Sequence, residues 1–146
     1  MALFPKKINP ATGEGVLEAF EDFLKLVRTQ AYTGINNAAY EVYYESQLEV
    51  PVYTGALRQS GRVEGDKREE AEKSNRFYRY VAYGLGKRVN PTPNAPDGYV
   101  RYAVEVHEDM GRSRRPKFLE DPAKTTLQKQ SAKVYKALRE VTKGAK

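Results

Sequence analysis

The single histidine of the chain lies among three carboxylates, and this group is where catalytic or metal chemistry would be sought first. His107 is flanked by Glu105, Glu108 and Asp109, and the sequence contains no cysteine. If the segment is a strand, successive side chains point to opposite faces, so His107 can converge only with Glu105 or Asp109. One histidine without a second histidine or a cysteine makes a poor transition-metal site, and a general base here would lack a nucleophile. We therefore expect no metal, no cofactor and no enzymatic activity.

Positive charge is the second feature, and it is concentrated toward the C-terminus. The formal net charge is +6, and the chain from Gly111 onward holds about eleven Lys and Arg against three acids. Such asymmetry can mark a polyanion-binding face, whereas a solvated helix face with a basic tail is the plainer interpretation. The basic loops that could contact a partner or DNA contain Lys87, Arg88, Arg112, Arg114, Arg115 and Lys117.

Length and composition indicate a small domain with a polar surface. The 146 residues are 40% hydrophobic and 30% charged, a size that suits one domain. No apolar run reaches the roughly 18 residues that cross a bilayer, and no signal-peptide core is present, so we expect a soluble protein made in the cytoplasm. We predict an extended leader over residues 1–15, a single α+β domain over 16–143 and a basic tail over 144–146.

Two segments have the periodicity of helices. Apolar residues recur at steps of three and four over 16–47 and again from 119 to about 143. Thr33 and Gly34 interrupt the first pattern, and a glycine costs about 1 kcal/mol relative to alanine inside a helix, so we predict a kink or break there. The first stripe consists of Phe20, Leu24, Val27, Ala31, Ile35, Ala38 and Val42, and the second of Leu119, Ala123, Leu127, Val134, Leu138 and Val141.

Three segments alternate as strands do. They are 57–64, 76–85 and 99–107, and in the last of them Val100, Tyr102, Val104 and Val106 share one face. The charged segment 65–75 is predicted as an exposed loop or a short polar helix, and the proline-rich segment 86–98 as a long loop. The fold class is therefore α+β: an antiparallel sheet of about three to four strands with a long N-terminal helix and a C-terminal helix packed on it.

Exposed surfaces in this arrangement suggest an oligomer. Tyr40, Tyr43 and Tyr44 either cover the sheet or form a patch between subunits, and packing in the core or at its rim is favoured. A free sheet edge and the far side of the long helix would both be covered by assembly. The candidate residues for a subunit or partner interface are Tyr40, Tyr44, Tyr99, Glu105, His107 and Glu108.

Two motifs resemble a family of phage virion proteins. VPVYTGALRQS at 50–60 resembles the family element P-x-x-T-G-x-L-R-x-S, and YAVEVHEDMG followed by KFLEDPA resembles a second signature in the same order. The family consists of small tail-completion or head–tail connector proteins of long-tailed bacteriophages, some described as minor capsid proteins. The resemblance implies a homo-oligomeric ring, a hexamer, at the neck of the virion, assembled in the host cytoplasm. Its partners would be neighbouring neck or adaptor and tail-tube proteins, with DNA in the lumen only and no membrane.

A small basic nucleic-acid-binding protein is the alternative. The isoelectric point near 9.4, the cationic C-terminal third and the Arg/Tyr alternation of 76–85 favour it. No helix-turn-helix, ribonucleoprotein or zinc-finger pattern is present. In a neck ring, by contrast, DNA must slide through the lumen, so most basic side chains are expected to contact protein partners.

Overall fold

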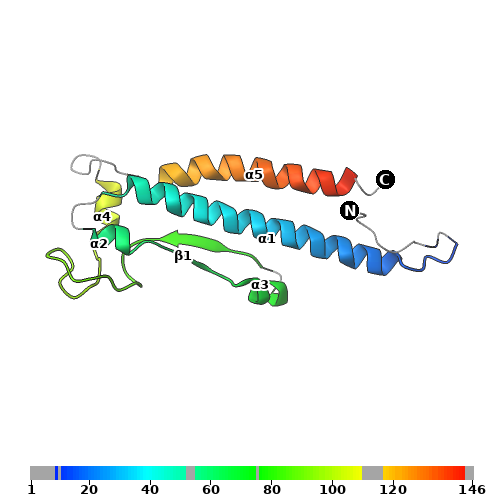
Figure 1. Cartoon of the computed structure of the whole chain (residues 1–146), viewed down its shortest axis with the longest axis horizontal. Coiled ribbons are helices and arrows are strands. Elements are labelled where there is room, and N and C mark those ends of the chain that lie inside the picture. The colour runs from blue at the N-terminus through cyan, green and yellow to red at the C-terminus, as the bar shows by residue number, and fades with distance from the viewer. Residues whose placement is uncertain (1–8, 10, 52–54, 75, 110–116, 144–146) are drawn as a thin grey trace.

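The long helix α1 is the axis on which the other elements pack. The structure, a computed structural model, describes residues 9, 11–51, 55–74, 76–109 and 117–143, without the side chains of 141 and 142. The elements are α1 (Val16–Glu49), α2 (Ala56–Gln59), β1 (Arg62–Gly65), α3 (Arg68–Ser74), β2 (Arg79–Ala82), α4 (Ala103–Glu108) and α5 (Glu120–Lys143). Helix α5 lies along one side of α1, and the β1–β2 hairpin lies along another (Figure 1).

Helix α1 is continuous for 34 residues, so the predicted interruption at Thr33 and Gly34 is wrong. Gly34 instead has a packing role, because a Cβ built on it would overlap the side chain of Val134 in α5. Because Gly34 has no side chain, α1 and α5 can approach each other closely at this point. The predicted C-terminal helix is confirmed as α5, within one residue of its expected start.

The sheet has two antiparallel strands in the described part of the chain. Arg62 of β1 lies opposite Ala82 of β2, and Gly65 lies opposite Arg79. The intervening charged segment contains the short helix α3, which was one of the two predicted alternatives. The α+β class is confirmed, whereas the predicted third strand is replaced by α4.

Helix α4 shows why the strand prediction for 99–107 is wrong. The alternating pattern required Val104 to be buried with Val100, but Val104 is 73% exposed whereas Val100 is completely buried. Ala103 and Val106 pack against the core, at the i, i+3 spacing of a helix. The six residues of α4 fit both the two-residue period of a strand and the 3.6-residue period of a helix. Their packing against the core decides in favour of the helix.

The segment 57–64, predicted as one strand, divides into α2 and β1. Gly55 adopts a left-handed conformation with φ of 75° immediately before α2, a backbone region that favours glycine. Leu57 is thereby directed into the core, where it is 3% exposed. Strand pairing begins only at Arg62.

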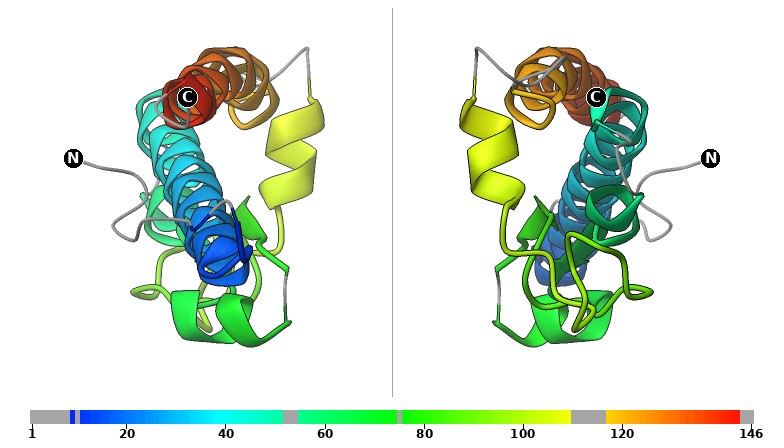
Figure 2. Two further views of the ribbon diagram at one scale, coloured as in Figure 1. Left: turned by 90° about the vertical axis from the view of Figure 1, so that its right-hand side faces the viewer. Right: turned by 90° about the vertical axis from the view of Figure 1, so that its left-hand side faces the viewer.

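The core lies at the C-terminal end of α1, where α2, α4 and the start of α5 meet (Figures 1 and 2). Its buried members are Val50, Ala56, Leu57, Val89, Ala95, Val100 and Phe118. Two of them, Val89 and Ala95, come from the predicted long loop, so this loop is partly anchored in the core. At the other end of the chain, residues 9 and 11–15 form a hydrogen-bonded turn before α1. The remaining leader and the basic tail lie outside the described residues.

Candidate functional site

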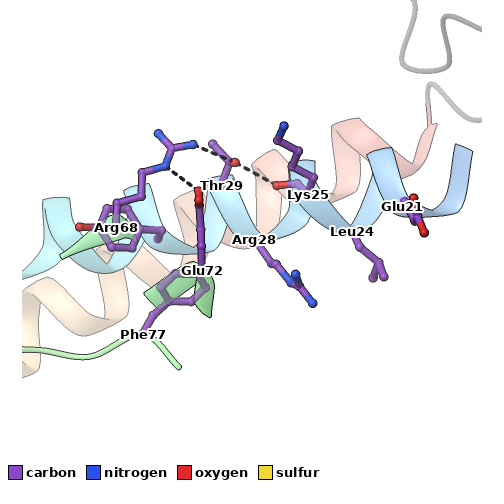
Figure 3. A pocket seen from close by; sticks show the side chains of 9 residues that line it. Glu21, Leu24, Lys25, Arg28, Thr29, Arg68, Glu72 and Phe77 are labelled. Carbon is purple, nitrogen blue, oxygen red and sulfur yellow. Dashed lines mark hydrogen bonds and ion pairs between the residues drawn. The ribbon is translucent and has the colours of Figure 1, made fainter. Parts of the chain in front are cut away.

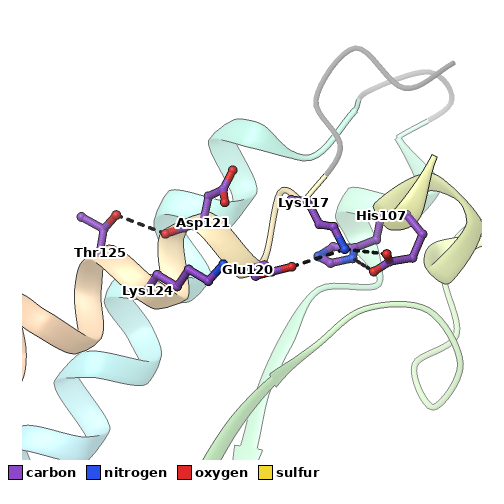
Figure 4. A network of polar contacts seen from close by, with 7 residues as sticks. His107, Lys117, Glu120, Asp121, Lys124 and Thr125 are labelled. Atoms are coloured by element: carbon purple, nitrogen blue, oxygen red, sulfur yellow. Dashed lines mark hydrogen bonds and ion pairs between the residues drawn. The ribbon is translucent and has the colours of Figure 1, made fainter. Parts of the chain in front are cut away.

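The histidine group forms a network of ion pairs that joins α4 to α5 (Figure 4). The Glu108 carboxylate lies 2.5 Å from Lys117 Nζ and 2.8 Å from His107 Nδ1. Lys117 also lies 3.3 Å from Glu120, which pairs with Lys124 at 2.5 Å. Lys117 and, next, His107 lower the pKa of Glu108 because both stabilise its charged form. These side chains are therefore engaged with one another, and the Lys117 ammonium is shared between Glu108 and Glu120.

The other predicted interface residues of this segment lie on or before α4 and not on a sheet edge, because residues 103–108 are helical. His107 is half-buried beside the Phe118 ring, whereas Glu105 is exposed on α4. Tyr99 is 40% exposed and lies before α4, with the Arg101 guanidinium 5.9 Å from its ring centre. Within the described ranges, no three His, Asp or Glu side chains are grouped so that they could hold a metal ion.

The tyrosines near the end of α1 do not all pack in the core. Tyr44 is 63% exposed and Tyr40 is 40% exposed, and their rings lie 6.3 Å apart on the surface of the helix. Tyr43 is half-buried. The favoured prediction of core or rim packing is therefore wrong for Tyr44, which remains available to a partner.

A basic cleft is formed where the end of α1 meets the loop after β2. Lys87 and Arg88 line it together with Arg58, which sequence reasoning did not assign to this group. The Arg58 guanidinium donates to the backbone oxygen of Gln47 at 2.9 Å, which fixes it against the end of α1. The cleft encloses about 720 Å³. The predicted loop arginines Arg112, Arg114 and Arg115 lie outside the described residues.

In a second pocket, between α1 and α3, three of the lining side chains bond to one another (Figure 3). Arg68 of α3 pairs with Glu72 at 3.2 Å and donates to Thr29 Oγ1 of α1 at 3.3 Å. The bond from Arg68 to Thr29 connects α3 to α1. Glu21 and Leu24 lie at the end of the pocket farthest from Arg68.

An apolar groove is the least expected surface feature. It lies between α1, α5 and β2 and has a volume of about 430 Å³. Two of its polar groups, Arg79 Nε and Thr126 Oγ1, have no hydrogen-bond partner in the described part of the chain. The apolar stripes of both helices signalled that these faces would be buried, but not that a space would remain between them. The groove is lined by Ile35, Ala38, Ala39, Val42, Arg79, Val81, Leu119, Ala123, Thr126 and Leu127.

The loop before α4 contains an ion pair whose effect can be measured. Arg101 lies 2.6 Å from Asp97 and, with the Tyr99 backbone N–H, lowers the pKa of Asp97 to about 2 from 3.8. The pair therefore stabilises the fold above the ordinary pKa, and this contribution is lost as the pH falls toward 2. We expect Arg101→Ala to raise the Asp97 pKa toward 3.8 in a carboxyl NMR titration. Arg76→Ala, which alters an exposed arginine elsewhere, should leave it unchanged; an unaltered value in Arg101→Ala would refute the pairing.

Comparisons of the chain with protein-family models, curated proteins and solved structures found no match. Among the described helices, none combines the length and apolar character that crossing a membrane requires.

Proposed function

We propose that the protein is a structural component of a tailed-phage virion that forms a ring at the head–tail neck. The proposal starts from the resemblance of the 50–60 element and of the 102–123 region to tail-completion and head–tail connector proteins. In this role it would complete the tail or connect the tail tube to the head, and it would carry out no catalysis.

The observation that carries the proposal is the amount of apolar surface that the described chain leaves uncovered. Leu17, Leu48, Val104 and Leu127 are each about 70% exposed, and they come from three helices, α1, α4 and α5. Single exposed apolar residues are common on protein surfaces, whereas apolar side chains that lie together are typical of a surface that contacts another chain. Tyr40 with Tyr44 on α1, and the walls of the groove around Leu127, are surfaces of this second kind.

The experiment is native mass spectrometry of the purified protein over a concentration series, with and without tail tubes. We expect discrete rings, hexamers above all, or stoichiometric capping of tube ends. Heterologous contacts close into rings of defined size. The neck proposal would be refuted if the protein stayed monomeric at every concentration and did not bind tail tubes.

The basic cleft supports a second candidate, a nucleic-acid-binding protein. Arg88 and Lys87 are exposed beside Arg58 and the half-buried Tyr43. Lys and Arg that neutralise phosphates release counterions, so affinity for DNA would fall steeply with salt. If this candidate is correct, Lys87→Ala with Arg88→Ala should flatten the salt dependence measured by fluorescence anisotropy. An unchanged salt slope in this double variant would contradict the candidate, because each lost phosphate contact should reduce the slope by about one.

A further inference from the structure

The N-terminal end of α1 presents an exposed surface that is partly apolar and partly acidic. Leu17 is 70% exposed and Phe20 is 56% exposed, and these turns of α1 extend past α3 and the hairpin (Figure 1). Leu24 continues the same face of α1 at helical spacing. Glu21 lies near Leu24 on this part of the helix (Figure 3). We refer to Leu17, Phe20, Glu21 and Leu24 as the helix tip. Nothing in the described chain covers Leu17 or Phe20 as a core would.

The apolar groove has the complementary properties. Leu127 at its rim is 68% exposed, although it belongs to the apolar stripe of α5. Thr126 is completely buried, yet its hydroxyl has no hydrogen-bond partner among the described residues. Arg79 donates to the Tyr32 hydroxyl at 3.2 Å through Nη2, but no described residue bonds to its buried Nε. Buried polar groups are normally satisfied, so the groove lacks both apolar cover and a hydrogen-bonding group.

We propose that the helix tip of one copy docks in the apolar groove of a second copy. The tip supplies Leu17 and Phe20 for the apolar walls and the Glu21 carboxylate for the guanidinium of Arg79. A charge-assisted bond of this kind sets orientation as well as affinity, and an amphipathic helix in an apolar groove is a recurrent form of recognition. The inference rests on the proposed function for its partner, a second copy of the chain.

The geometry of this contact determines the type of assembly. The tip and the groove are different patches of one chain, so the contact is heterologous, the type from which rings are built. Each subunit then has one donor surface and one acceptor surface. A variant defective in the tip should therefore retain a working groove, and a variant defective in the groove should retain a working tip.

The test uses full-length Phe20→Glu and Leu127→Glu in sedimentation velocity over a concentration series. Both substitutions replace exposed side chains, and each should weaken self-association at least tenfold because it places a carboxylate in an apolar contact. Mixing the two variants should restore one contact only, so that a 1:1 heterodimer forms and does not grow further. Tyr135→Glu is the matched control, since Tyr135 is 71% exposed on α5 and does not line the groove.

Three results would overturn the inference. The first is a wild-type protein that stays monomeric at every concentration. The second is unchanged assembly of both variants, and the third is a mixture of the two variants in which no heterodimer forms. Circular dichroism of each variant confirms that the fold is retained. If both variants still capped tail tubes with wild-type stoichiometry, the proposed neck function would stand and only the docking surface would be refuted.

Discussion

Phe118→Ala is expected to lower the free energy of unfolding by about 3–5 kcal/mol. Phe118 is 3% exposed at the start of α5. Its ring meets the Tyr83 ring edge to face at 5.1 Å and the His107 ring at 5.2 Å. One side chain thus joins the end of the hairpin, α4 and α5, and its removal would leave a cavity that all three border. Guanidinium unfolding followed by circular dichroism would give the value, at a protein concentration low enough to limit association.

Tyr135→Ala provides the comparison for Phe118→Ala. It removes an aromatic ring of similar size from α5, the helix that follows Phe118, but Tyr135 is 71% exposed, so the change should stay within about 0.5 kcal/mol. Equal losses in the two variants would contradict a special role for burial at Phe118, because burial is the main difference between the two positions and alanine itself favours a helix. A loss below about 1 kcal/mol in Phe118→Ala would contradict the assignment of the core itself.

The two long helices, α1 and α5, could be predicted from the sequence because their patterns are long. Apolar residues of α1 recur at steps of three and four from Phe20 to Val42, and no strand pattern of that length competes with it. The region around α4 could not be predicted in the same way. There, six residues fit a strand and a helix equally well, and the choice is made by the contacts of Val100, Ala103 and Val106 with distant parts of the chain.

The contacts between the candidate residues could not be predicted from the sequence. Glu108 was assigned to a subunit or partner interface and Lys117 to a basic loop, and the ion pair between them was not predicted. Charge pattern shows which residues are polar, not which of them meet. The apolar groove was not predicted at all, because a space between elements depends on the distance between α5 and β2 and not on the pattern of either one.

Gly34→Ala should change stability through the distance between α1 and α5, because Gly34 lies where the two helices meet. Helix propensity alone predicts that alanine would stabilise α1 by about 1 kcal/mol. The added Cβ would overlap the branched side chain of Val134, and overpacking of this kind costs about 1–3 kcal/mol. We therefore expect a net loss of stability, so the sign of the change in a chemical unfolding experiment decides between propensity and packing.

Removing the clash should reverse that loss. In the double variant Gly34→Ala with Val134→Ala, the two helices can approach again, so the double variant should be more stable than the sum of the single changes predicts. Thr33→Ala, at an exposed neighbouring position, is the control for propensity and should be neutral or slightly stabilising. Because α5 forms one wall of the apolar groove, Gly34→Ala alone should also weaken self-association, and the double variant should recover it. Recovery of stability without recovery of association would show that the groove is not the surface on which subunits meet.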